Sequence, residues 1–125
     1  MKILKVGIAS YSDMKARTMA IARGELKPGP SDPKVWFPST ESLVRVLSEK
    51  NRLLLGTIKK SEPKSLAELA ELTGRKKSNL SRTLKTMQCY GIVTLKRETR
   101  GRLVPHVPYQ RVSVDLQLVE PSRLA

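Results

Sequence analysis

Residues 65–74 read Ser-Leu-Ala-Glu-Leu-Ala-Glu-Leu-Thr-Gly, and residues 77–91 read Lys-Ser-Asn-Leu-Ser-Arg-Thr-Leu-Lys-Thr-Met-Gln-Cys-Tyr-Gly. In the first stretch, Ser65 and Glu68 have the spacing of a capping box, in which each side chain bonds the backbone amide of the other residue. Gly74 suits the end of the same helix, because glycine adopts a left-handed backbone at little cost. The first stretch therefore predicts a short, well-capped helix that ends in a tight turn.

The second stretch predicts a longer helix. Its apolar residues Leu80, Leu84 and Met87 fall at i, i+4 and i+7, which places them on one buried stripe. Gly91 is expected to end this helix, and we expect Cys89 to be packed near its end. Two helices joined by a short turn that contains glycine form a helix-turn-helix.

Polar and basic side chains occupy the other faces of the second helix. In the major groove of DNA, Asn79 can pair with adenine, and Arg82 or Lys85 can pair with guanine. Serines on the same faces can bond phosphates or base edges. The candidate DNA-binding residues of the turn and the helix are Arg75, Lys76, Lys77, Ser78, Asn79, Ser81, Arg82, Lys85 and Thr86.

The start of the second helix is open to two interpretations. In one, Lys76 is the N-cap, and its positive charge opposes the helix dipole. Loss of a good cap typically costs about 1 kcal/mol. A bound phosphate would reverse both effects, because the backbone amides at a helix N-terminus favour an anion. In the other interpretation, the helix begins one turn later with Ser78 as its cap.

A basic hairpin is predicted directly after the second helix. Residues 93–97 form an alternating strand, residues 98–102 form a turn, and residues 103–104 resume the strand before Pro105 and Pro108 break it. A hairpin in this place is the wing of a winged helix, whose tip would reach the flanking minor groove or the DNA backbone. The candidate DNA-binding residues of the wing are Arg97, Arg100 and Arg102.

The chain is predicted to consist of a winged helix with additions at both ends. Residues 1–23 form a strand-helix extension, a candidate dimerisation or partner-binding element, and residues 24–38 form a proline-rich connector. Residues 39–118 form the winged helix-turn-helix domain, and residues 119–125 form a C-terminal tail. The predicted fold class is α+β, mainly α: a winged helix-turn-helix with an N-terminal strand-helix extension.

Apolar residues mark the parts of these additions that we expect to pack. The connector ends in the only tryptophan and the only phenylalanine of the chain, Trp36 and Phe37, which we expect to pin it to the core. Residues 112–118 alternate between apolar and polar side chains, which predicts a further strand. One face of the helix in the extension carries Met14, Thr18, Ile21 and Ala22.

The positive charge of the chain is concentrated in one block. The 125 residues include 24 Lys and Arg against 11 Asp and Glu, which gives a net charge of +13. Residues 74–111 hold ten basic side chains and one acidic side chain, and they include the predicted recognition helix and wing. A block of this kind favours a polyanionic partner, above all nucleic acid.

Several functional classes are excluded by the residues that the sequence lacks. With only one cysteine and one histidine, Cys89 and His106, the chain cannot assemble a disulfide framework or a Cys/His metal site. We expect no catalytic residues, no cofactor and no metal, because the carboxylates are scattered and no glycine-rich phosphate-binding motif occurs. The free thiol, with no secretory signal and no membrane-spanning apolar run, predicts a cytoplasmic, nucleoid-associated protein that does not enter a membrane.

Parts of the sequence resemble the MarR/ArsR-type winged helix-turn-helix of prokaryotic regulators. In that family a Ser-Arg or Thr-Arg pair stands in the middle of the recognition helix, here Ser81-Arg82, and a Gly-[Leu/Ile]-Val triplet marks the turn into the wing, here Gly91-Ile92-Val93. The resemblance covers residues 40–104 and implies a winged-helix fold and DNA binding. The segments that carry it are residues 65–74, 79–85 and 90–93.

The whole chain is similar to a family of small DNA-binding proteins of bacteria and archaea. The segments that recur in that family are residues 14–24, 33–37 and 74–82. The similarity implies a transcriptional regulator and, as in some members, an antitoxin paired with a small cognate toxin protein. The chain lacks the long C-terminal helix through which larger regulators dimerise, so any dimer must form differently.

We therefore expect a sequence-specific binder of double-stranded DNA that regulates transcription as a repressor and, in the antitoxin case, controls its own operon. RNA binding through the same basic block and a protein-interaction adaptor remain as alternatives. RNA is disfavoured because residues 74–111 offer only Tyr90 and Tyr109 for base stacking. The adaptor is disfavoured because the recognition helix carries several cations.

We also expect a homodimer on a nearly palindromic site. One winged helix reads too few base pairs to select a single site in a genome, and dimers of such proteins place two recognition helices about one helical turn apart. The candidate interfaces are residues 2–23, whose strand needs a partner, and residues 112–118. In the alternative arrangement, residues 2–9 close the sheet of their own subunit.

Overall fold

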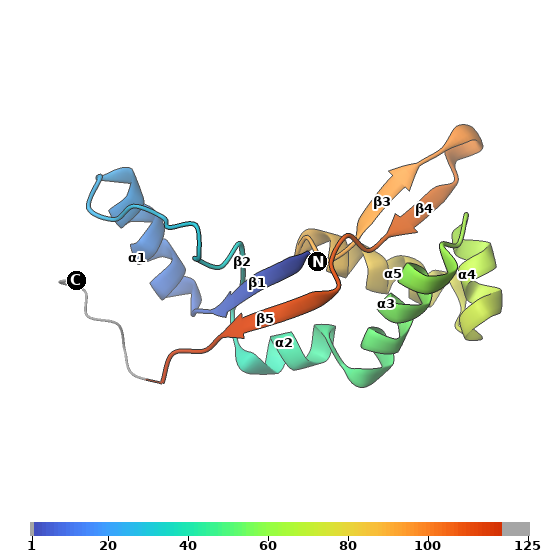
Figure 1. Cartoon of the computed structure of the whole chain (residues 1–125), viewed down its shortest axis with the longest axis horizontal. Coiled ribbons are helices and arrows are strands. Elements are labelled where there is room, and N and C mark those ends of the chain that lie inside the picture. The colour runs from blue at the N-terminus through green and yellow to red at the C-terminus, as the bar shows by residue number, and fades with distance from the viewer. Residues whose placement is uncertain (1, 119–125) are drawn as a thin grey trace.

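The computed structural model describes residues 2–118, which contain five α-helices, five strands and one 3-10 turn. Helix α1 lies at one end of an elongated molecule, the helix-turn-helix and its hairpin lie at the other end, and a small sheet lies between them (Figure 1). The elements are β1 (Ile3–Ile8), α1 (Tyr11–Ala22), β2 (Val35–Phe37), α2 (Thr40–Val46), α3 (Glu49–Ser61), α4 (Leu66–Thr73), α5 (Lys77–Cys89), β3 (Thr94–Arg97), η1 (Thr99–Gly101), β4 (Leu103–His106) and β5 (Arg111–Asp115).

This architecture confirms the predicted fold class. It is α+β and mainly helical, with the α4–α5 pair and the β3–β4 hairpin in the positions of a winged helix-turn-helix. The strand and the helix predicted at the N-terminus are β1 and α1. The connector before α2 contributes one further strand, β2.

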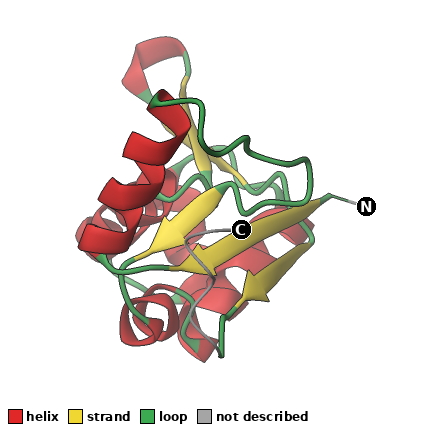
Figure 2. Cartoon of the chain, turned by 90° about the vertical axis from the view of Figure 1, so that its left-hand side faces the viewer, coloured by secondary structure: helices red, strands yellow, loops and turns green. Residues whose placement is uncertain are grey.

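The central sheet is parallel and has the strand order β2-β1-β5 (Figure 2). In its register, Val6 of β1 stands between Val35 of β2 and Val114 of β5. Side chains alternate between the two faces of a strand, so Leu4 and Val6 point to the same side. Both are buried in the hydrophobic core. The strand order makes β1 the middle strand, with this face towards the core.

Both edges of β1 are therefore hydrogen-bonded within the same chain. Residues 2–9 close the sheet of their own subunit, which is one of the two arrangements that the sequence left open. The strand has no free edge through which a second copy could pair. The free edges of the sheet belong to β2 and β5.

The opposite face of the sheet has a close approach that requires glycine at position 7. A Cβ atom on Gly7 would lie 2.5 Å from Cζ3 of Trp36 and 3.0 Å from Cγ of Pro33. The indole of Trp36 therefore lies directly against β1. Phe37, the next residue, is fully buried on the core face and pins the connector to the core as predicted. The same expectation for Trp36 was wrong, because its indole packs on the opposite face of the sheet.

Serine caps set the limits of the two helices that follow the sheet. Ser39 and Ser42 form a reciprocal capping box at the start of α2. The hydroxyl of Ser48 accepts the backbone amide of Asn51 at 3.2 Å and starts α3. Each cap satisfies an amide that has no partner within its own helix, so the chain can end one helix and begin the next within two residues.

Helix α5 is held in place by its apolar stripe. Leu80, Leu84 and Met87 are fully buried, as their spacing predicted. Directly after the helix, the ring of Tyr90 stacks on Phe37 of β2, with centroids 4.2 Å apart and planes 13° apart. This contact joins the sheet to the helix-turn-helix, so that α5 is fixed at both the stripe and its C-terminal end.

The predicted hairpin is formed by β3 and β4, which pair antiparallel from Thr94–His106 to Arg97–Leu103. One expectation about it was wrong: Pro105 does not end the second strand but lies inside β4, opposite Leu95. Proline is tolerated there because β4 has only one neighbour, and an amide that points away from β3 makes no ladder bond.

Two further expectations differ from the structure. Helix α1 has no buried residue, so the face that carries Met14, Thr18, Ile21 and Ala22 is not a core face. Of these four residues, only Met14 is half-buried. The strand predicted over residues 112–118 ends at Asp115, because its partner β1 ends shortly after Gly7, which pairs with Asp115. Leu116 and Leu118 are exposed.

Candidate functional site

The first helix of the helix-turn-helix begins at a cap and ends at a glycine. The hydroxyl of Ser65 accepts the amide of Glu68 at 3.0 Å. The return bond differs from the predicted capping box, because the Glu68 carboxylate accepts the amide of Lys64 at 3.1 Å in place of that of Ser65. Gly74 has a φ of 73°, the left-handed conformation expected of it, and turns the chain from α4 towards α5.

Helix α5 begins without a side-chain cap. Lys76 is its N-cap, as the first of the two interpretations had it, and no side chain bonds the amides of the first turn. The Lys76 carbonyl accepts the amide of Leu80 at 2.9 Å, which closes the first turn of the helix. The first amides of α5 and the positive end of its dipole therefore lack a side-chain partner, and the exposed Lys76 and Lys77 stand beside them.

The face of α5 opposite the apolar stripe is exposed along its length. Ser78, Arg82, Lys85 and Cys89 follow one another at i, i+4, i+7 and i+11, and all four are exposed. The expectation that Cys89 is packed was wrong, because its spacing from Arg82 places it on this outward face. Asn79 and Thr86 are exposed beside this row, and Ser81 is half-buried.

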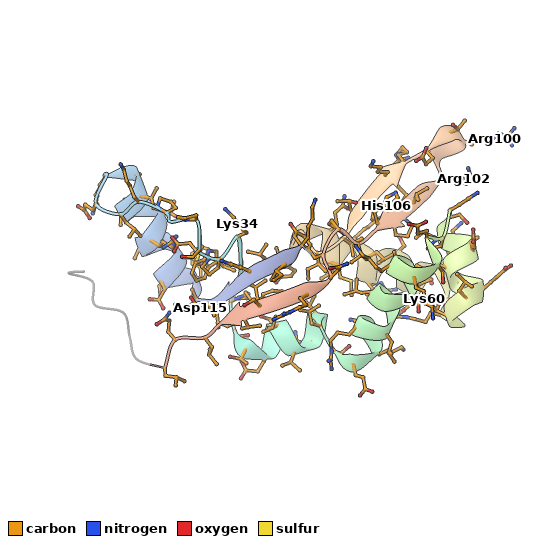
Figure 3. All side chains as sticks on the ribbon, in the orientation of Figure 1. Lys34, Lys60, Arg100, Arg102, His106 and Asp115 are labelled. Atoms are coloured by element: carbon orange, nitrogen blue, oxygen red, sulfur yellow. The ribbon has the colours of Figure 1, made fainter. Side chains whose placement is uncertain are left out.

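A hollow of about 670 Å³ lies where α4, α5 and the hairpin meet. The hairpin turn contributes Arg100 and Arg102, whose side chains extend from the tip of the wing (Figure 3). The first turns of α5 contribute Lys77, Ser78 and Ser81, and the start of α4 contributes the segment from Ser65 to Ala67.

The structure thus brings five of the twelve predicted site residues around one hollow: Lys77, Ser78, Ser81, Arg100 and Arg102. Arg97 stands outside it on the exposed part of β3. The other candidates lie along α5 or in the turn before it. The twelve predicted residues therefore all lie on α5, in the turn before it, or on the hairpin.

Arg75 has a different environment from the other basic candidates. Its Nε and Nη2 atoms donate to Oδ1 of Asn79 at 3.0 and 2.7 Å, and Nη2 also donates to Oγ1 of Thr83 at 3.3 Å. Its Nη1 atom donates to Oδ1 of Asn51 in α3 at 3.2 Å. All three guanidinium nitrogens are thus bonded within the chain, and the side chain is half-buried.

The sequence did not single out Asn51 or Thr83. Asn51 is 24 residues from Arg75, and no local pattern connects the two. Thr83 and Asn79 stand eight and four residues after Arg75, a spacing that places them on one side of a helix. That spacing was the one available signal.

The basic candidates carry uncompensated charge. Across residues 2–118 the structure has one ion pair, between Arg17 and Asp32, at 3.1 Å and at the far end of the molecule. The lysines and arginines of α5 and the wing therefore have no carboxylate partner in the part of the chain that the structure describes. Their charges add at one end of the molecule and create a field that attracts anions.

Metal sites and membrane-spanning helices have less support among residues 2–118 than an anion-binding site. Residues 2–118 contain no cluster of three or more His, Cys, Asp or Glu side chains that could hold a metal ion. His106 is exposed on β4. None of the helices described for these residues is both long enough and apolar enough to cross a membrane.

Comparisons with known proteins gave one family and one structure. The family model HVO_A0114 matches residues 46–114, which include α3, the helix-turn-helix and the wing. A search of curated proteins found no match. The crystal structure of the predicted DNA-binding transcriptional regulator from E. coli is similar at 20% sequence identity and a TM-score of 0.47, over 81% of this chain and 86% of that chain.

Proposed function

We propose that this chain, which belongs to the HVO_A0114 family, binds double-stranded DNA sequence-specifically and regulates transcription. The observation that carries the proposal is the meeting of the uncapped start of α5 with the wing arginines around one hollow. No carboxylate pairs with these cations among residues 2–118. A phosphate in the hollow would bond the free amides and neutralise the charges at once.

The exposed face of α5 is the element we assign to base recognition. A major groove about 12 Å wide admits one α-helix. With its apolar stripe buried in the core, the helix presents Ser78, Arg82 and Lys85 outward. Arg82 and Lys85 can each donate to the O6 and N7 atoms of guanine, the commonest specific contact.

The wing is the element we assign to the DNA backbone or the minor groove. Arg100 and Arg102 lie at its turn, and Arg97 lies at the end of β3. Contacts of this kind fix the position of the protein on the duplex and contribute affinity that does not depend on sequence.

Selection from a pool of random duplexes tests the proposal. We expect the full chain to enrich a defined sequence, and Arg82→Ala to weaken binding to that duplex by about 1–3 kcal/mol and relax the preference at one base pair. Arg23→Ala, at the end of α1 far from the wing, is the control for loss of one charge. Equal losses on the selected and a scrambled duplex would mean that Arg82 contacts only the backbone.

Single-stranded RNA of the same length is the competitor that separates DNA binding from the RNA alternative. We expect it to displace the selected duplex poorly, because the basic end of the molecule has no aromatic platform for unstacked bases. If RNA competes better than the selected duplex, the proposed function is wrong.

We further propose that the regulator is a homodimer that represses transcription from a nearly palindromic site. Removing residues 1–38 would not test the interface, because it would delete β1 and β2, two of the three strands of the central sheet. Two exposed surfaces remain as candidates: Met19 and Ile21 on α1, and Val114 and Leu116 at the end of β5.

Sedimentation of the full chain with and without the selected duplex tests the dimer. Ile21→Glu and Val114→Glu are exposed substitutions, so we expect the one at the interface to give monomers without unfolding the protein. A wild-type chain that is monomeric at micromolar concentration, even on a palindromic duplex, would exclude the dimer.

The antitoxin role is the most specific part of the proposal. It rests on the family resemblance and on the apolar residues that α1 exposes at the end opposite to the wing. When a cytoplasmic, nucleoid-associated regulator of this kind dimerises through β5, the α1 end is free to bind a toxin while DNA is bound. We expect a short protein encoded beside this chain to co-purify with it and to be lost from Ile21→Glu; a neighbour that never co-purifies would contradict the role.

A further inference from the structure

Asn79, the asparagine of the recognition helix, is held by a single arginine. Two nitrogens of Arg75 donate to its Oδ1 atom, at 3.0 and 2.7 Å. The same guanidinium is held from the other side by Asn51, whose Oδ1 accepts from Arg75 at 3.2 Å. Asn51 in turn donates from Nδ2 to the carbonyl of Val46 at 3.0 Å. A chain of hydrogen bonds therefore runs from the end of α2 to the exposed face of α5.

The chemistry of arginine fixes the orientation of this amide. A guanidinium carries five N–H donors and no acceptor, so only the oxygen of an amide can face it. The amide oxygen has two lone pairs. Both are engaged by Arg75 in this structure.

Asn79 then differs from an unrestricted asparagine in what it can offer a base. An amide that pairs with adenine accepts from N6 through its oxygen and donates to N7 through its nitrogen. With the oxygen engaged, Asn79 presents only the two hydrogens of Nδ2. Guanine shows two adjacent acceptors, O6 and N7, in the major groove, whereas adenine places a donor beside its acceptor.

We propose that Arg75 restricts Asn79 to hydrogen-bond donation, so that this position of α5 selects guanine rather than adenine. Arg75 is thus a positioning residue that acts through Asn79, although its charge alone suggested a direct contact with DNA. The inference rests on the proposed binding of duplex DNA and specifies one base that the site would read.

The experiment compares the sequences that full-length variants select from random duplexes. In the wild type we expect a guanine at the position whose preference is lost in Asn79→Ala. In Arg75→Met the oxygen of Asn79 is released, and we expect the guanine-to-adenine affinity ratio at that position to fall by about 10-fold, the size of one bidentate contact. Arg52→Met is the matched control, because Arg52 is an exposed arginine next to Asn51.

Asn79→Asp keeps the acceptors that Arg75 needs and removes both donors. It therefore preserves the network even if Arg75→Met fails to fold, and we expect it to lose guanine selection without gaining adenine. A wild-type preference for adenine at the Asn79-dependent position would overturn the proposal. So would a guanine-to-adenine ratio that does not change in a folded Arg75→Met protein, or guanine selection that persists in Asn79→Asp.

A measurement on the protein without DNA separates this proposal from the proposed function. Exchange of the Arg75 Nε–H with solvent, followed by NMR, should be slow in the wild type and become faster in Asn79→Ala, with no change in Arg52→Met. Unchanged exchange in Asn79→Ala would overturn the network itself. If the network is present but no duplex sequence is enriched, the proposed DNA binding fails and guanine selection fails with it.

Discussion

Helices α1 and α5 lie at opposite ends of the molecule and are stabilised in opposite ways (Figure 1). Helix α1 has a good cap, since the hydroxyl of Ser10 accepts the amide of Asp13 at 3.2 Å, but none of its residues is buried. Helix α5 has no side-chain cap, yet Leu80, Leu84 and Met87 are fully buried. One helix depends on local signals, and the other depends on tertiary packing.

The difference shows how a helix can keep an uncapped N-terminus that is available to bind an anion. Packing of a buried stripe contributes several kcal/mol, whereas a cap contributes about 1 kcal/mol. Helix α5 can therefore leave its first amides free and surround them with lysines without losing its place in the fold. Helix α1 has no buried stripe to stabilise it in this way. It contacts the connector through Arg17, which bonds Asp32 and stands 5.2 Å from the ring centroid of Trp36.

The largest expected effect is on the packing of α5. Leu84→Ala should lower the free energy of unfolding by about 2–5 kcal/mol, because it leaves a cavity under the helix. Ile21→Ala, a matched truncation on α1, should change it by no more than about 0.5 kcal/mol, because that side chain is at the surface. Denaturant unfolding of both variants measures the difference, and similar losses would contradict the comparison.

An intermediate effect is expected at the start of α5. Lys76→Ser supplies the missing cap and should raise the free energy of unfolding by about 1 kcal/mol, while it weakens DNA binding. Lys76→Ala removes the same charge without adding a cap and is the control. If the serine variant is no more stable than the alanine variant, the backbone amides in the first turn of α5 do not lack a cap, which would contradict this account.

The smallest effect on stability is expected at the ion pair between Arg17 of α1 and Asp32, and it depends on pH. The amide of Gly29 and the guanidinium of Arg17 bond to Asp32 and lower the pKa of its carboxyl below the ordinary value of 3.8. The folded pKa is the lower one, so this stabilisation is complete above pH 3.8 and is lost as the pH falls through the folded pKa. Trp36 fluorescence should report the loosening in the wild type, and Asp32→Asn should show no such transition.

The sequence was sufficient where the structure depends on local signals. Short-range patterns predicted the helix-turn-helix and the wing. They are the helix-ending glycine at Gly74, the apolar stripe that begins at Leu80, and the alternating apolar and polar residues of 93–97. The position of β1 was not predictable in this way. Its pairing of Ile3 with Arg111 joins strands more than a hundred residues apart, and a parallel pair has no connecting turn to mark it.

The candidate site shows the same limit. Spacing alone placed Arg82 and Lys85 on the exposed face of α5. The link from Arg75 to Asn51 runs from the turn before α5 to α3, so it depends on how the helices pack. The spacing within α1 placed Met14 and Ile21 on one face, but it could not tell whether that face is buried, because a periodic pattern does not show whether a partner surface is present.

The salt dependence of duplex binding tests most directly whether the wing end binds DNA. Two variants with equal net charge are compared with the wild type: Arg97, Arg100 and Arg102 changed to Ala in the wing, and the exposed Lys15, Arg23 and Lys27 changed to Ala at the other end. We expect the wing variant to flatten the plot of log affinity against log salt by about one unit per lost phosphate contact, and the other variant to leave it unchanged. Equal slopes in the two variants would mean that binding follows net charge, and the assignment of DNA binding to α5 and the wing would be wrong.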